Sequence, residues 1–308
     1  MRKSTIYLDR KLIPFFHTQS NNYREQNIYS HMFREDICLA ITPIGARSRK
    51  HPNFSTALEG ADREAAIAIL ESLSENYREN LNVTVCDAID DIAKQLSWRG
   101  YATFEIIKTN TGEISLEAIT GQKTYTIPFV TLQFVPRQEW TQWKKKITVC
   151  PNKKIWQITM PRLLGGKHGY KKIISSLNKF SAGGAPKFYM ENLEKNINQS
   201  YFNPSEYTKN KNITIGRSTK SWGWNRRDWS TEHSTEYYTF YRTINFRKAQ
   251  AALREHIIKE INKLFSRLNI SCTLSVTGIP SYLDIIETGK LLKSGEIDFS
   301  EASKRISL

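Results

Sequence analysis

The sequence lacks the patterns by which disulfide-rich and membrane-spanning proteins are recognised. Its cysteines, Cys38, Cys86, Cys150 and Cys272, lie far apart and form no CxxC pair, so we expect reduced, mostly buried thiols and no disulfide framework. No apolar run approaches the ~18–20 residues that span a bilayer, and the N-terminal stretch has no long apolar segment of the signal-peptide type. We expect a cytoplasmic protein, or a virion protein if its origin is viral, without a membrane partner.

The sequence also lacks most marks of an enzyme. It contains no GxxxxGK followed by Ser or Thr, no GxGxxG after an expected strand and no GxSxG, the patterns that hold phosphate or a serine nucleophile. Its six histidines show no HxH or HxxxH spacing, so we expect no metal site. LGGKHGY at 164–170 precedes an expected helix and can hold an anion there, although we favour a tight turn. We expect no catalytic residues and no cofactor.

One group of acids comes close to the site of a metal-dependent nuclease. Such enzymes hold Mg²⁺ with carboxylates beside the lysine of an ExK motif. Here Asp87, Asp90 and Asp91 precede FEIIK, which contains Glu105 and Lys108. The ExxK spacing puts the glutamate and the lysine on opposite faces of a strand, and the aspartates fall on the polar face of an expected helix. We interpret these residues as solvated surface and keep the nuclease as an alternative.

Positive charge is abundant and unevenly distributed. The chain of 308 residues has a formal net charge of +15. Residues 57–117 hold twelve acids and five basic residues, whereas 137–187 hold twelve basic residues and one acid, and 207–254 hold ten basic residues and three acids. Clustered cations gain affinity for nucleic acids by releasing counterions from the phosphates. The two basic blocks therefore favour a nucleic-acid partner over charge that serves only solubility.

Hydrophobic periodicity predicts an α+β fold with short mixed strands, packed helices and one long amphipathic helix. Helices are expected at 59–79, 84–98, 168–180, 186–198, 245–268, 281–293 and 299–306. Thr84 and Asp87 can form a capping box at the start of the second helix, which Gly100 ends. Strands are expected at 101–107, 114–119, 124–136 and 270–276, and a hairpin at 145–149 and 155–160.

Four segments organise the chain. They are an irregular N-terminal arm at 1–56, an α+β core domain at 57–200, a basic aromatic loop region at 201–244, and the long helix with a C-terminal α/β segment at 245–308. Residues 199–240 are expected to be irregular. The long helix has an apolar stripe on one side. Its other side carries Arg247, Lys248, Arg254, Lys259, Lys263 and Arg267.

The loop region combines tryptophan with arginine. STKSWGWNRRDWSTEHSTEYYTFYR (218–242) contains three tryptophans around Arg226 and Arg227. Three interpretations stay open and are ranked in this order: a subunit interface, because Trp, Tyr and Arg dominate binding hot spots; a nucleic-acid loop with indoles stacked on bases; and plain packing of the core. The expected interface residues are Trp222, Trp224, Trp229, Tyr237 and Tyr238.

Two stretches resemble the portal proteins of tailed phages. VCDAIDDIAKQLSWRGYATFEIIKTNTGEISLEAI is similar to a portal core in which a helix runs through a glycine into a strand, and KIWQITMPRLLGGKHGYKKIISSLNKFSAGGAPKFYM is similar to the stretch that follows. The resemblance lies within about residues 84–200, and the chain is shorter than typical portals. It implies a ring of identical subunits that passes DNA through a central channel, with 245–268 as a stem-type helix.

We therefore predict a non-enzymatic, oligomeric structural protein of portal-like type that contacts double-stranded DNA through its phosphates, without reading bases. Two alternatives are kept: a nucleic-acid-binding subunit of a defence or mobile-element complex, with or without a nuclease site, and a basic adaptor for an acidic protein. Other proteins of a larger assembly are expected as partners. The residues expected to contact DNA are Lys144, Lys145, Lys146, Lys153, Lys154, Lys171, Lys172, Arg226 and Arg227.

Overall fold

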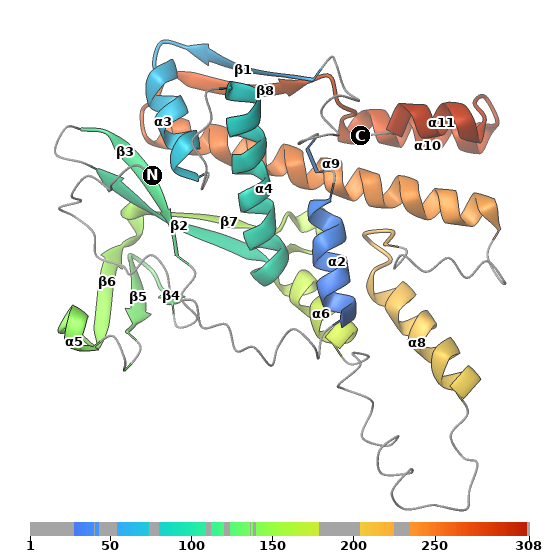
Figure 1. Cartoon of the computed structure of the whole chain (residues 1–308), viewed down its shortest axis with the longest axis horizontal. Coiled ribbons are helices and arrows are strands. Elements are labelled where there is room, and N and C mark those ends of the chain that lie inside the picture. The colour runs from blue at the N-terminus through green and yellow to red at the C-terminus, as the bar shows by residue number, and fades with distance from the viewer. Residues whose placement is uncertain are drawn as a thin grey trace, which may run out of the picture.

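In the part of the chain that the structure describes, helices and three small antiparallel sheets make up the fold, which confirms the α+β class (Figure 1). The structure is a computed structural model that describes residues 28–39, 41–42, 54–73, 80–108, 112–119, 124–135, 137, 140–178, 204–224 and 235–306. The expected helix at 186–198 lies outside these residues, as do Arg226, Arg227 and Trp229.

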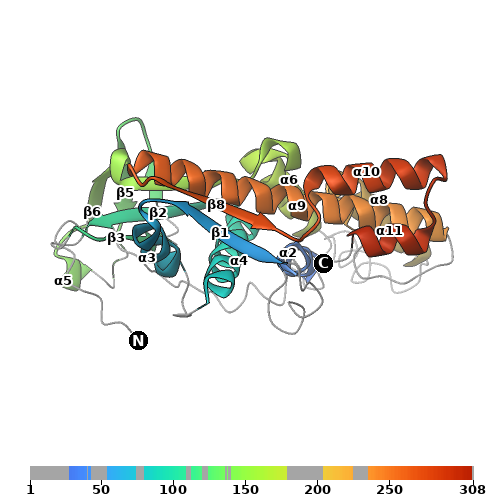
Figure 2. The same ribbon diagram turned by 90° about the horizontal axis from the view of Figure 1, so that it is seen from above.

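The long helix α9 (Glu236–Arg267) runs along much of the length of the molecule (Figure 2), and several of the other helices and strands pack against it. Within the described ranges, no helix is both long and apolar enough to cross a membrane. The helices are α2 (Ile28–Cys38), α3 (Arg63–Leu73), α4 (Leu81–Arg99), α5 (Trp140–Trp143), α6 (Gly166–Asn178), α8 (Pro204–Ser218), α9 (Glu236–Arg267), α10 (Tyr282–Ser294) and α11 (Phe299–Ile306).

Each sheet has two or three strands. The strands are β1 (Ser55–Gly60), β2 (Tyr101–Lys108), β3 (Ile114–Ala118), β4 (Thr124–Thr126), β5 (Val130–Phe134), β6 (Ile147–Pro151), β7 (Ile155–Thr159) and β8 (Cys272–Thr277). They pair as β1–β8, β3–β2–β7 and β4–β5–β6. The hairpin expected from 145–149 and 155–160 is therefore wrong. The short 3-10 helix η3 (Asn152–Lys154) separates β6 from β7, and the two strands join different sheets.

Two segments expected to be irregular contain helices. In the N-terminal arm, α2 buries Phe33 and Ile37 completely, and in the loop region α8 and the first turns of α9 are helical. One hydrophobic cluster joins Phe33, Ile89, Trp222 and Ile257, so it takes residues from all four expected segments. The core thus crosses every boundary between those segments.

Helix α4 ends as expected but begins earlier. Asn80 is its cap, with the side chain accepting a hydrogen bond from the backbone N–H of Asn82, so Thr84 lies inside the helix and is buried. Gly100 ends the helix with φ 75°, the left-handed conformation that glycine adopts without steric cost. The strand β2 follows at once, which sets α4 across the sheet β3–β2–β7 (Figure 1).

The Trp-Gly-Trp sequence that follows α8 lies in the core. Trp222 and Trp224 are 0% and 2% exposed and lie against the ring of Phe33. The indole Nε1 of Trp224 donates to Asp36 Oδ2 at 2.8 Å, and Arg242 donates to the Trp224 carbonyl. Gly223 has φ +68°, and a Cβ there would lie 2.5 Å from Asn245 Cβ and 2.7 Å from the Arg242 carbonyl oxygen. Only glycine fits between these tryptophans.

We expect Gly223→Ala to lower the free energy of unfolding by about 2–4 kcal/mol, because alanine is strained at this φ and its methyl overlaps backbone of α9. Gly216→Ala is the matched control: nothing lies within 4 Å of the added Cβ, and alanine favours the helix by up to about 1 kcal/mol. Urea denaturation measures both. Equal stability of the two variants would contradict the tight packing at Gly223.

Candidate nucleic-acid interface

A row of cations lies along the C-terminal half of α9. Lys259, Lys263 and Arg267 are spaced by four residues, so they share one side of the helix, and all three are exposed. At 1.5 Å per residue they extend over about 12 Å. Glu260 lies beside this row and pairs with Lys263, Nζ to Oε1 2.6 Å. We call the row, together with the neighbouring Lys153, the α9 cation ridge.

Hydrogen bonds fix the ridge against the strand β7 and the turn before it. The Arg267 guanidinium donates to the carbonyl oxygens of Asn152, Lys153 and Ile155 at 3.1, 2.6 and 2.8 Å. Nearer the start of α9, His256 Nε2 lies 2.9 Å from the Thr159 carbonyl oxygen. These contacts cover the edge of β7 that does not pair with β2. Arg267 is thus a structural residue, whereas Lys153, Lys259 and Lys263 keep exposed side chains.

The expected DNA-contacting lysines fall into three groups that the fold keeps apart. Lys144, Lys145 and Lys146 are exposed between α5 and β6, and Lys153 and Lys154 lie at the other end of β6. Lys171 and Lys172 are exposed on α6, which packs beside α2 and away from α5 (Figures 1 and 2). Of these lysines, Lys153 belongs to the α9 cation ridge and Lys154 lies next to it in the chain. Lys259 and Lys263 were expected on the polar side of the long helix. Their four-residue spacing predicts that they lie next to each other on that side.

Arg254 does not belong to the solvated side of the long helix. It is 2% exposed, and its guanidinium donates to the carbonyl oxygens of Ile41 and Pro280 at 3.3 and 2.6 Å. Burial lowers the pKa of this guanidinium to about 10. Its expected place on the polar side of the long helix is wrong, because hydrogen bonding to carbonyl groups allows the guanidinium to be buried.

Among the described residues expected at an interface, the tryptophans are buried and the tyrosines are exposed. Trp222 and Trp224 are buried within the chain, so plain packing, ranked last from the sequence, describes these two indoles. Tyr237 and Tyr238 are about half exposed at the start of α9. Tyr237 stacks on Tyr241 and lies edge-on to Phe299 of α11. These two tyrosines remain candidates for a contact with another molecule.

The nuclease alternative finds no site at its expected residues. Glu105 is 1% exposed and faces Cys150, whose thiol lies 3.9 Å from Oε1. The neighbouring β2 residues Phe104 and Ile106 point the other way, into the core shared with α4, so the sheet separates Glu105 from the aspartates of that helix. Within the described residues, no group of three His, Cys, Asp or Glu side chains is placed to hold a metal ion.

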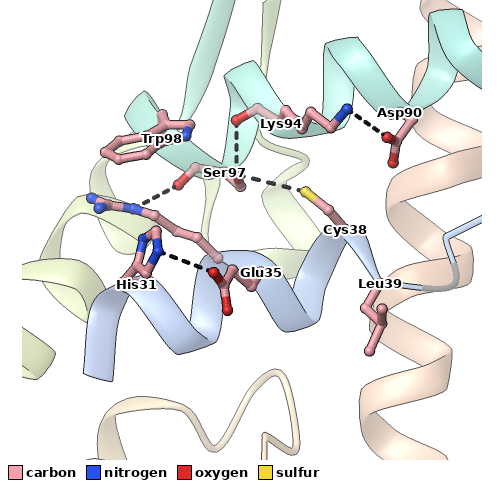
Figure 3. A pocket seen from close by; sticks show the side chains of 9 residues that line it. His31, Glu35, Cys38, Leu39, Asp90, Lys94, Ser97 and Trp98 are labelled. Carbon is pink, nitrogen blue, oxygen red and sulfur yellow. Dashed lines mark hydrogen bonds and ion pairs between the residues drawn. The ribbon is translucent and has the colours of Figure 1, made fainter. Parts of the chain in front are cut away.

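A pocket of about 330 Å³ lies between α2 and α4. Its walls include Leu39 and Trp98, each about half exposed, and the charged side chains Glu35, Asp90 and Lys94 (Figure 3). Lys94 pairs with Asp90 at 2.8 Å, and His31 pairs with Glu35 at 3.0 Å.

The chemistry of this pocket favours binding over catalysis. Burial raises the pKa of the Cys38 thiol to about 12, so the thiol stays protonated near neutral pH and is a poor nucleophile. The thiol lies 3.8 Å from Ser97 Oγ, which donates to the Lys94 carbonyl at 2.7 Å (Figure 3). The apolar walls of the pocket can accommodate an apolar group, and the charged side chains around it are paired with one another.

Comparisons with known proteins assign no family. No protein-family model and no curated protein matches the chain. The chain is similar to a solved structure described as "Neck of empty GTA particle computed with C6 symmetry", with 9% sequence identity, a TM-score of 0.49, and 96% of this chain and 95% of that chain covered. At this identity and TM-score the similarity carries no argument about function.

The contact of His256 with β7 predicts a pH dependence of stability. Burial lowers the pKa of His256 below its ordinary 6.5, although the Thr159 carbonyl and Glu260 act in the opposite direction. The unfolded chain therefore binds a proton first as the pH falls. The contribution of His256 to the unfolding free energy is complete above pH 6.5 and is lost as the pH falls from there to the lower pKa of the folded state.

Denaturation midpoints between pH 8 and pH 5 measure this contribution. His256→Gln keeps a side-chain N–H donor for the Thr159 carbonyl but cannot titrate, so we expect a smaller loss of stability on acidification than in the wild type. An identical pH profile for the two proteins would contradict a neutral, donating His256.

Proposed function

We propose that this protein is a structural, DNA-associated subunit of an oligomeric, phage-type assembly, which contacts double-stranded DNA through phosphates without reading sequence. The observation that carries the proposal is the α9 cation ridge. Lys153, Lys259 and Lys263 present exposed ammonium groups along one rigid helix and the adjoining turn, with Glu260 as the neighbouring acid. The resemblance of residues 84–200 to portal proteins supports the same role.

The dimensions of the ridge suit a phosphate backbone. Its helical part extends over about 12 Å, and one strand of a duplex carries a phosphate about every 3.4 Å along the axis, so the ridge spans roughly three or four phosphates. Arg267 fixes the helix against η3 and β7 through three hydrogen bonds. The lysines therefore contact the DNA backbone from a rigid support. Such phosphate contacts orient a protein on the duplex without reading its bases.

The burial of Trp222 and Trp224 favours duplex DNA over single-stranded nucleic acid. Proteins that bind single strands stack bases on exposed aromatic side chains beside a basic groove. Both indoles are in the core, and the aromatic residue between Lys259 and Arg267 on α9, Phe265, is buried as well. Phosphate contact along the ridge is then the main source of affinity.

Two other functions make different predictions. An adaptor for an acidic protein would bind no duplex even at low salt, because it lacks the gain from counterion release along a polyphosphate. A nuclease subunit would cleave DNA with divalent metal, and loss of that cleavage in Glu105→Ala would contradict a purely structural role. We expect the protein to leave duplex DNA intact with and without Mg²⁺.

Changing Lys153, Lys259 and Lys263 together to glutamine should weaken duplex binding and flatten its salt dependence. Each phosphate contact contributes about 0.9 to the slope of log affinity against log salt concentration. We therefore expect the slope to fall by about three units in magnitude, as measured by fluorescence anisotropy of a labelled 30-base-pair duplex over a range of salt concentrations.

The matched control removes three exposed lysines from α10 and α11, Lys290, Lys293 and Lys304. It changes the net charge equally but should leave the slope within about one unit of the wild type. Equal effects of the two triple variants would show that net charge alone attracts the DNA. An unchanged slope in the ridge variant would overturn the assignment of the interface.

A further inference from the structure

The sheet β4–β5–β6 buries its polar face and exposes its apolar face, the opposite of the usual arrangement. In an antiparallel sheet, residues paired across strands point to the same side. Thr131 pairs with Cys150 and Gln133 with Thr148, and all four are buried. On the other side Phe134 pairs with Ile147 and Leu132 with Val149. The polar face thus lies inside and the apolar face outside.

The buried polar face has partners within the chain. Thr131 Oγ1 donates to Asn152 Oδ1 at 2.8 Å, Thr148 Oγ1 contacts the Gln133 carbonyl at 3.4 Å, and the Cys150 thiol lies 3.9 Å from Glu105. If the apolar face were buried instead, these polar groups would lose their hydrogen-bond partners. A buried polar group without a partner lowers the stability of the fold considerably. The outward apolar face is therefore a fixed property of the fold.

The apolar face is large enough to be an interface. Five of its side chains, Tyr125, Ile127, Phe134, Ile147 and Val149, are between 42% and 56% exposed. Phe129, in the turn between β4 and β5, is 87% exposed. With ~150–250 Å² for each aromatic side chain, the six expose on the order of 500 Å². That is more than half of the ~800 Å² that each partner gives to a standard interface.

Phe129 occupies a backbone position that suits glycine. The Ile127 N–H donates to the Val130 carbonyl at 3.0 Å, and Pro128 precedes Phe129, whose φ is 74°. Positive φ is the left-handed region that glycine and asparagine adopt most readily in turns. A bulky side chain held there and turned to solvent is strained. Folding of the single chain does not require it.

The rim of the apolar face is basic. Lys144, Lys145 and Lys146 precede β6 and Lys153 follows it, all exposed. Among the described residues of this sheet and its flanks, none is acidic. A two-fold pairing of this face with itself would place two lysine rims in one interface and repel. The favoured partner surface is apolar and carries no excess of positive charge.

The same chain carries a surface of that kind. The pocket between α2 and α4 has Leu39 and Trp98 in its walls, and its two acids, Glu35 and Asp90, balance its two cations, Arg34 and Lys94. Its volume of about 330 Å³ lies at the lower end of the ~300–1,000 Å³ range of ligand pockets, which is ample for one aromatic ring. Figure 1 places α2 and α4 near the middle of the molecule, apart from β4–β5–β6 at one end.

We propose that the apolar face docks on a second copy of this chain, head to tail, with Phe129 of one subunit in the α2–α4 pocket of the next. The inference rests on the oligomeric function proposed above and names its contact. Because the two surfaces differ and lie apart on the molecule, each subunit offers one of each. Repetition then leads to a ring or an open filament.

Two single variants and their mixture test this arrangement. Phe129→Gly removes the inserted ring and relieves the positive φ, and Leu39→Lys adds charge to the pocket wall. Light scattering without DNA should show a large oligomer for the wild type and a monomer for each variant. A 1:1 mixture should give a heterodimer and nothing larger, because the first variant keeps a pocket and the second keeps a phenylalanine.

Two controls separate a lost contact from a lost fold. Monomeric Phe129→Gly should have a higher denaturation midpoint than monomeric Leu39→Lys, since glycine suits the turn. Leu283→Lys, at a 70% exposed leucine of α10, should remain oligomeric. If Leu39→Lys does not fold, Glu35→Lys replaces it as the pocket variant.

Other outcomes would overturn the inference. An oligomer formed by Leu39→Lys alone would mean that the sheet face pairs without the pocket, and a monomeric mixture would mean that another partner covers the face. A wild type that is monomeric yet binds duplex through the α9 cation ridge would refute this contact and leave the DNA-binding role standing. A ring that binds no duplex would refute the DNA-binding role and leave the subunit contact standing.

Discussion

The buried polar contact between α9 and the end of α2 is the constraint on which the rest of the structure depends. The last carbonyls of a helix have no partner within it. Gln250 Nε2 of α9 donates to the carbonyl oxygens of Asp36, Ile37 and Leu39 at 2.9, 3.1 and 2.6 Å, and Arg254 reaches Ile41. This contact fixes α2 against α9, and with it one wall of the α2–α4 pocket and the aspartate that holds Trp224.

The two proposed surfaces use different physics. The α9 cation ridge acts through charge, so its affinity depends on salt and tolerates many sequences of DNA. The apolar face of β4–β5–β6 acts through burial and shape, which salt affects little. A subunit that assembles through the apolar face and contacts DNA through the α9 cation ridge can stay assembled while the salt concentration changes its affinity for DNA.

Much of the fold could be predicted, but not α2. Strong periodicity identified α4, the end of that helix at Gly100 and most of α9. In α2 the buried positions include Ser30, Arg34 and Asp36 beside Phe33 and Ile37, so polar residues face the core and obscure the apolar stripe. Arg34 is buried because its Nε donates to the Ser97 carbonyl at 3.2 Å, a partner 63 residues away that local pattern does not show.

The sequence alone determined the excess of positive charge, the α+β composition and the four-residue spacing that aligns Lys259, Lys263 and Arg267 on one side of a helix. Helical geometry depends on local spacing, which is why that alignment could be read from the chain. Only the tertiary structure decided that Trp222 and Trp224 are core residues and that β5 and β6 turn their apolar side outward. Alternation along a strand defines two faces, but which face is buried depends on the partners that Thr131, Cys150 and Glu105 find across the fold.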